Sequence, residues 1–145
     1  MPRTAPAVKQ AGIRALGAEL VLCDASERFD VAARLCAERG AAMVPPFNDE
    51  LVMAGQGTVG LEILEQCPEL DAVVVPVSGG GLIGGVSTAV KALAPRVRVF
   101  GAEPAVLPRY TESLRAGHPV QVEQKRSVAD ALVAAQMGGA GHAAG

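Results

Sequence analysis

The stretch that decides the fold is "VVVPVSGGGLIGG", Val73–Gly85. An apolar, β-branched run typical of a buried strand leads into three consecutive glycines and then into a helix-like pattern. With a second strand-like run at 97–102, it predicts a βαβ unit, and such units bind ligands beyond the carboxyl ends of their strands. Glycines let backbone N–H groups converge, and a helix N-terminus attracts anions, so the loop is typical of a phosphate site.

The sequence on either side of this unit alternates between helix-like and strand-like patterns. Helices are expected to begin at the capping residues Thr4 and Ser26, and the second to end at Gly40. In the helix at 55–67, Val59, Ile63 and Cys67 are expected to face inward. Strands are expected at Ala18–Asp24, 41–44 and 71–77, the last of them buried on both faces; further helices are expected at 82–94, 109–117 and 127–136, and a loop at 45–50.

Composition narrows the class of protein. The chain has 145 residues, of which 50% are hydrophobic but only 3% aromatic, which favours parallel strands under helices over an aromatic-rich sandwich. With a net charge of −2 and no basic cluster, we expect no nucleic-acid partner. Three cysteines without metal-type spacing indicate a reducing compartment, and no apolar run suits a membrane helix. We therefore expect a cytoplasmic α/β protein.

The glycine loop allows a second interpretation. Gly79, Gly81 and Gly84 match G-x-G-x-x-G between a strand and a helix, and Glu103 follows the next strand. This is the dinucleotide fingerprint in its required context, so an NAD(P)-type binding domain is an alternative. No G-x-x-x-x-G-K-[ST] pattern occurs, which excludes a P-loop nucleotidase on motif grounds.

Three stretches carry a resemblance to a known family: "MPRTAPAVKQAGIRALGAEL" (1–20), "AGQGTVGLEILEQ" (54–66) and the glycine-loop segment through "KALAPRVRVFGAEPA" (91–105). In this order and spacing they resemble the serine racemase and serine/threonine dehydratase (threonine ammonia-lyase) family. These are fold-type II enzymes, similar to the tryptophan synthase β-subunit, that use pyridoxal 5′-phosphate (PLP). The resemblance implies that the cofactor phosphate is held by backbone amides of the loop, namely Ser78, Gly79, Gly80, Gly81 and Leu82.

The resemblance also implies a domain organisation. Residues 1–45 resemble the later part of the family's small domain, and residues 46–137 the first half of its large PLP-binding domain. Residues 138–145 form a Gly/Ala tail that we expect to be disordered. We expect a chain truncated at both ends, as from a partial gene product.

The family's Schiff-base lysine lies in a Ser-x-Lys-x-Arg-Gly stretch that this sequence lacks. Lys9, Lys91 and Lys125 have no such motif around them and are expected to be surface residues. We therefore assign no catalytic residue and expect this chain alone to be inactive. A non-catalytic fragment that folds with a partner is a further alternative.

For a full-length protein, the resemblance implies water elimination from serine or threonine, or serine racemisation, in a homodimer acting on small amino acids. Some family members bind Mg²⁺ or Mn²⁺, for which it implies Glu103, the Leu107 carbonyl and the residue at position 109. Here that residue is Arg109 rather than an acid, which argues against Mg²⁺ because hard cations require oxygen ligands. The expected partner of Glu103 is then Arg109 or solvent. In "SVADAL" (127–132), Ala131 stands where the family has glycine.

Overall fold

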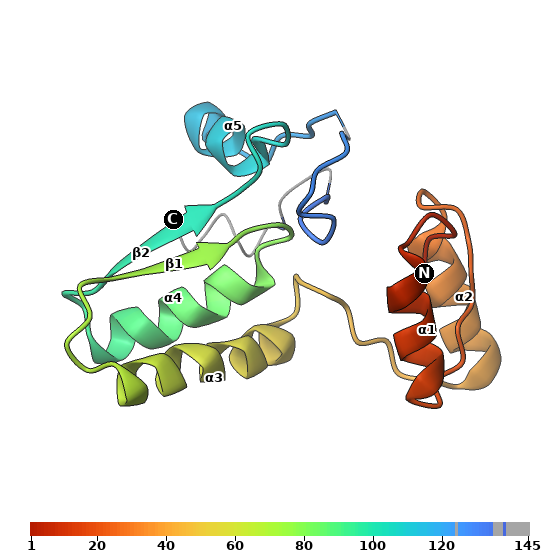
Figure 1. Cartoon of the computed structure of the whole chain (residues 1–145), viewed down its shortest axis with the longest axis horizontal. Helices are drawn as coiled ribbons and strands as arrows, with labels where there is room; N and C mark the ends of the chain where they lie inside the picture. Colours follow the sequence, from red (N-terminus) through yellow and green to blue (C-terminus); the bar gives the residue numbers. More distant parts are fainter. Residues whose placement is uncertain (124, 135–137, 139–145) are drawn as a thin grey trace. The chain divides into compact units, whose positions relative to one another are not determined.

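The computed structural model describes residues 1–123, 125–134 and 138, and the chain forms two compact units, Met1–Val44 and Pro45–Gly145. The predicted family domains remain predictions, and the tail predicted to be disordered lies, apart from Gly138, outside the described residues. No helix in the described part is long and apolar enough to cross a bilayer. The elements, labelled in Figure 1, are α1 (Ala7–Ala15), α2 (Arg28–Arg39), α3 (Glu50–Gln66), β1 (Ala72–Pro76), α4 (Gly81–Leu93), β2 (Arg98–Ala102) and α5 (Arg109–Ala116).

The first unit contains α1 and α2 and no regular strand among its residues. The strands predicted at Ala18–Asp24 and 41–44 are therefore wrong. A strand requires a neighbour to accept and donate its backbone hydrogen bonds. Within this unit the only such pairing is an isolated parallel bridge between Pro2 and Cys23, so these apolar runs stay irregular.

The two N-caps predicted in this unit are also wrong. The helix α1 is capped by Pro6 rather than Thr4, and α2 by Glu27 rather than Ser26, neither with a side-chain cap bond. With Thr4 as the N-cap, its hydroxyl would accept a hydrogen bond from the N–H of the residue two or three positions later. The residue two positions later is Pro6, which has no N–H, so one of these two bonds cannot form. The end of α2 is as predicted, since Gly40 adopts the left-handed conformation at the C-cap.

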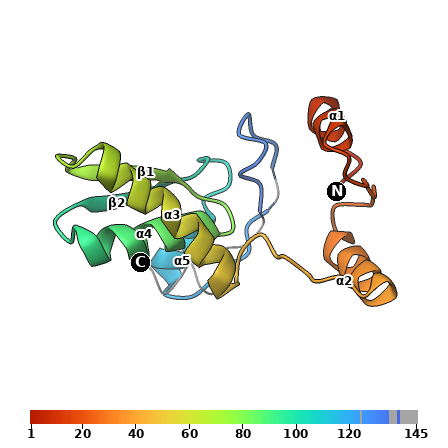
Figure 2. The same ribbon diagram turned by 90° about the horizontal axis from the view of Figure 1, so that it is seen from below.

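The second unit is built on a parallel β-sheet of two strands among the described residues, which confirms the predicted α/β class with parallel strands. β1 pairs with β2 in a register running from Ala72 opposite Arg98 to Pro76 opposite Ala102. The helix α4 connects them, because parallel neighbours require a long crossover connection. Figure 2 shows the same unit from below, with α3 nearest the viewer and the strands behind it.

Only one face of this sheet is covered in the described structure. Val73 and Val75 are buried against α4, whereas Val74 is 66% exposed and Phe100, its register partner, 47% exposed. The prediction that the strand is buried on both faces is therefore wrong. Side chains alternate across a strand, and the helices α4 and α3 lie on one side of the sheet only.

The helices α3 and α4 meet at glycines. A Cβ added at Gly60 would lie 3.1 Å from the Cβ of Ala89 and 3.1 Å from the carbonyl oxygen of Val86. One added at Gly85 would lie 2.6 Å from the backbone nitrogen of Gly57. The two backbones are thus too close for side chains at these positions. Glycines, and not only the predicted apolar side chains, therefore form the inward face of α3.

Of the three side chains predicted to face inward from α3, Ile63 packs at the edge of the core, but Val59 and Cys67 are exposed. The predicted start of α3 differs as well. Asp49 caps the helix by accepting a hydrogen bond of 2.9 Å from the N–H of Val52, so the predicted loop ends at Asp49.

The helix predicted at 127–136 is not present in its described part. Residues 127–134 form turns and irregular backbone. The Ser127 hydroxyl accepts a hydrogen bond of 3.2 Å from the N–H of Ala129, a local bond that competes with a helical start.

The glycine contact yields a stability test. Gly85→Ala is expected to lower the free energy of unfolding of the second unit by about 1–3 kcal/mol, because the new methyl group meets backbone rather than a side chain that can move. The midpoint of urea unfolding followed by circular dichroism would measure this change.

Gly55→Ala is the matched control, since Gly55 lies in α3 and a Cβ added there would have nothing within 4 Å. It is expected to stabilise the unit by about 0.5–1 kcal/mol through helix propensity. Equal effects of the two substitutions would contradict the packing described above.

Candidate functional site

The glycine loop lies between the end of β1 at Pro76 and the start of α4 at Gly81. Gly79, Gly80 and Gly81 are all buried. Gly80 is the N-cap of α4 and has φ 103° and ψ −11°, in a region that side-chain-bearing residues rarely adopt. Here glycine is required by the backbone itself, and this turn aims the N-terminus of α4 at the loop.

One side of the loop is packed against the segment that precedes α3. A Cβ at Gly79 would collide with the aromatic ring of Phe47, and one at Gly81 would lie 3.2 Å from the carbonyl oxygen of Pro46. Packing therefore explains the absence of side chains at Gly79 and Gly81. Sequence reasoning missed Phe47, because no local pattern links it to a loop some thirty residues later.

The N-terminus of α4 is suited to an anion. The N–H of Gly84 donates to the carbonyl of Gly80 at 2.9 Å as the first bond of the helix. The N–H groups of Gly81, Leu82 and Ile83 therefore have no acceptor within the helix. The first turn carries no acidic residue, so no side-chain carboxylate competes with or repels an anion at the positive end of the helix dipole.

The oxygens of the loop are occupied by other parts of the unit. The Ser78 hydroxyl oxygen accepts from the N–H of Ala134 at 3.2 Å, and its carbonyl oxygen accepts from Nε of Arg109 at 3.1 Å. The Gly79 carbonyl accepts from the N–H of Gly138 at 2.8 Å. The five predicted residues thus form one segment in which the carbonyls of Ser78 and Gly79 are bonded, which leaves amides to face a ligand. The bonds from Ala134 and Gly138 had no signal in the sequence.

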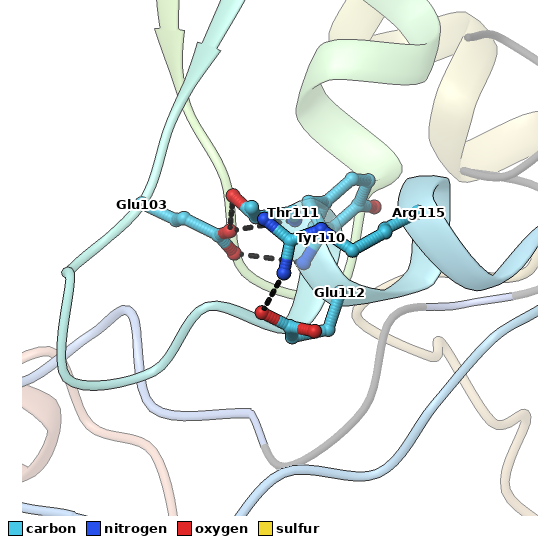
Figure 3. Close-up of polar contacts among 5 residues, drawn as sticks. All are labelled: Glu103, Tyr110, Thr111, Glu112 and Arg115. Atoms are coloured by element: carbon cyan, nitrogen blue, oxygen red, sulfur yellow. Dashed lines mark hydrogen bonds and ion pairs between the residues drawn. The ribbon is translucent and has the colours of Figure 1, made fainter.

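Glu103 lies at the N-terminus of α5 (Figure 3). One carboxylate oxygen accepts from the N–H of Tyr110 at 2.9 Å, and the other accepts from the N–H and the hydroxyl of Thr111, both at 2.9 Å. Glu103 therefore satisfies the first N–H groups of this helix from outside it. The same view shows Arg115 paired with Glu112 on the helix surface.

The side chain of Arg109 does not make the contact with Glu103 that the sequence suggested. Of the two partners expected for Glu103, Arg109 or solvent, Arg109 instead donates hydrogen bonds from a fully buried guanidinium to backbone carbonyls, including that of Leu107 at 3.2 Å. Burial lowers the pKa of Arg109, while the nearby Glu103 and Tyr110 raise it in part.

The three positions that the resemblance implied for a metal thus have other contacts. The oxygens of Glu103 accept three hydrogen bonds, and the Leu107 carbonyl accepts two from Arg109, one from its backbone N–H and one from Nη1. Among the described residues, no group of three or more His, Cys, Asp or Glu side chains is placed to hold a metal ion. The engaged carboxylate of Glu103 also weakens the dinucleotide interpretation, which needs it for ribose hydroxyls.

A cavity of about 460 Å³ lies between β2, α4 and α5, lined in part by Lys91, Phe100 and Tyr110. The hydroxyl of Tyr110 is buried there with no hydrogen-bond partner in the described structure. Burial raises the pKa of Tyr110, opposed in part by Arg109. The glycines of the loop do not line this cavity, so the cavity is separate from the anion site proposed at the N-terminus of α4. We place the candidate site at the loop and not in the cavity.

Two of the three lysines have contacts away from the loop. Lys91 donates to the carbonyl of Val97 at 2.9 Å from the last turn of α4, and Lys125 pairs with Glu123 at 3.5 Å. Lys91 is ten residues after Gly81, which corresponds to about 15 Å along the helix. Lys91 is therefore at the opposite end of α4 from the candidate site.

Comparison with known proteins gives concordant results. The sequence profile of the family described as pyridoxal-phosphate dependent enzymes matches residues 1–143. An L-threonine ammonia-lyase from Thermotoga maritima is 45% identical over 140 residues, which cover 95% of this chain and 35% of that protein. A serine racemase from Oryza sativa subsp. indica is 42% identical over 134 residues, 91% of this chain and 40% of that protein.

Among solved structures, maize serine racemase has a TM-score of 0.93 at 39% identity, covering 99% of this chain and 44% of that one. The threonine deaminase isoform 2 from Solanum lycopersicum has a TM-score of 0.89 at 39% identity, and the match covers 99% of this chain and 43% of that one. Their fold is the fold-type II architecture that the resemblance implied. The chain thus spans less than half of the length of these relatives, and over its own length it belongs to the family of pyridoxal-phosphate dependent enzymes.

Proposed function

We propose that Ser78–Leu82 binds the phosphate of PLP, in a full-length enzyme that eliminates water from hydroxy-amino acids or racemises them. The observation that carries the proposal is the left-handed Gly80 at the N-terminus of α4, where the carbonyls of Ser78 and Gly79 are bonded and the first amides of the helix have no helical acceptors. Such an arrangement fits a phosphate held by backbone amides without a lysine or arginine reaching from the loop itself.

The reaction class is supported by the relatives named threonine ammonia-lyase, serine racemase and phenylserine dehydratase. All three names refer to reactions of small amino acids. When bound, PLP supplies an electron sink that stabilises negative charge at the substrate Cα. The role of residues 78–82 is to bind the cofactor phosphate and so to orient the ring. A homodimer of the full-length protein stays a prediction of the family resemblance.

Binding by the loop alone is expected to be weak. Four amide bonds to a charged phosphate contribute about 1.5 kcal/mol each, and immobilising the ligand costs about 4 kcal/mol. The difference of about 2 kcal/mol corresponds to a dissociation constant of about 30 mM. This sequence also lacks a Ser-x-Lys-x-Arg-Gly stretch, so we propose that the chain binds the phosphate non-covalently and does not catalyse the reaction alone.

The proposal is tested by titrating the 145-residue chain with pyridoxine 5′-phosphate, which carries no aldehyde to react with lysines. Amide shifts in ¹H–¹⁵N spectra are expected to change first at Ser78–Leu82. Gly80→Asp is expected to weaken binding at least about tenfold, because a side chain at φ 103° is strained and the carboxylate repels the phosphate.

Gly117→Asp is the matched control, since Gly117 also has a positive φ, of 75°, but lies at the C-cap of α5 and not in the glycine loop. It should leave binding unchanged, and pyridoxine without a phosphate should give no shifts at the loop. Shifts that are equal with and without the phosphate group, or equal in the wild type and Gly80→Asp, would refute the assignment.

The dinucleotide alternative makes a separate prediction that we expect to fail. Binding of NADH would raise its fluorescence, and Glu103→Ala would abolish the increase by removing the acceptor for the ribose hydroxyls. Because Glu103 is bonded to the amides of α5, no increase is expected at millimolar NADH. A fluorescence increase that depends on Glu103 would favour the dinucleotide function instead.

A further inference from the structure

The most unusual side chain in the second unit is the buried cation of Arg109. Its side chain is fully buried, yet in the described structure it donates to backbone carbonyls and not to a carboxylate. Nη2 donates to Val77 at 2.9 Å and to Leu132 at 3.0 Å, Nε to Ser78 at 3.1 Å and Nη1 to Leu107 at 3.2 Å. Burying a guanidinium is costly unless its donors are satisfied, so this site is built around it.

Two of these acceptors belong to the loop itself. The carbonyl of Val77 and the N–H of Ser78 share one peptide plane, and a trans peptide directs them to opposite sides. The same holds for the carbonyl of Ser78 and the N–H of Gly79, and the chain contains no cis peptide among its described residues. By binding both carbonyls, Arg109 turns the N–H groups of Ser78 and Gly79 away from itself.

Two consecutive N–H groups directed to one side form a concave anion-binding arrangement. The N–H of Gly138 donates to the Gly79 carbonyl, and the same peptide geometry directs the N–H of Gly80 away from Gly138. The guanidinium also places a full positive charge beside the carbonyls of Val77 and Ser78. Glu103, the carboxylate that acts on Arg109, is already bonded to the amides of α5.

We propose that Arg109 is a positioning residue for the phosphate loop, which it holds by its carbonyls so that the amides of Ser78 and Gly79 face the ligand. The proposal rests on the function proposed above for the loop. It assigns to Arg109 a role that depends on its guanidinium and not on side-chain volume.

The test compares Arg109→Ala with Arg115→Ala in the full 145-residue chain. Arg115 lies in the same helix but is exposed and paired with Glu112, which makes it a matched control. Without any ligand, ¹⁵N order parameters at Ser78–Gly80 are expected to fall from about 0.85 to below about 0.6 in Arg109→Ala only. Amides of β1 and β2 should keep their wild-type values.

Titration with inorganic phosphate provides the second readout. Arg109→Ala is expected to bind phosphate about tenfold more weakly than Arg115→Ala, a loss of about 1.4 kcal/mol, because the loop amides are no longer held toward the ligand. Millimolar guanidinium chloride should restore loop order in Arg109→Ala, whereas sodium chloride at the same concentration should not. Recovery of this kind distinguishes a lost guanidinium from lost packing.

Three results would overturn the proposal. They are wild-type loop order in Arg109→Ala, loss of order in β1 and β2 together with the loop, and recovery that is absent or equal in sodium chloride. Failure of the phosphate function gives a different pattern, in which the wild type binds no phosphate while the order parameters still respond to Arg109→Ala.

Discussion

The second unit depends on the close approach of two helix backbones. Without side chains at Gly60 and Gly85, α3 lies directly against α4, and α4 can then be covered by α3 on one side and by the sheet on the other. A helix held on two sides has little freedom to shift along its axis, because packed interfaces resist small displacements. The position of its first turn, and with it the position of the loop amides, follows from this contact.

The candidate site is ordered by the division of polar groups between its two sides. Carbonyl oxygens of Val77, Ser78 and Gly79 are bonded to Arg109 and Gly138, and the amides of the same peptides are directed away. The phosphate binding that we propose for this loop would need no charged side chain in the loop itself. Specificity for a particular phosphate ester must then come from groups that contact the rest of the molecule.

The sequence predicted the βαβ unit and the glycine loop well, because both have local signals: a β-branched run, consecutive glycines and a helical pattern. It failed where the deciding partner is distant. Apolar residues 18–24 lack a neighbouring strand within their unit, and Arg109 is buried by carbonyls that lie up to 32 residues away. Likewise, the ring of Phe47 covers Gly79 through a contact that no pattern near either residue indicates.

The sheet, covered on one face only, leaves the second unit exposed to association with other strands. Among the described residues each strand bonds to a single neighbour, so both edges present free backbone groups beside the exposed Val74 and Phe100. Open edges next to apolar side chains attract other strands, whether from a partner or from aggregating copies. Protection of the unit from aggregation would therefore require further strands at these edges and a second layer over Val74 and Phe100.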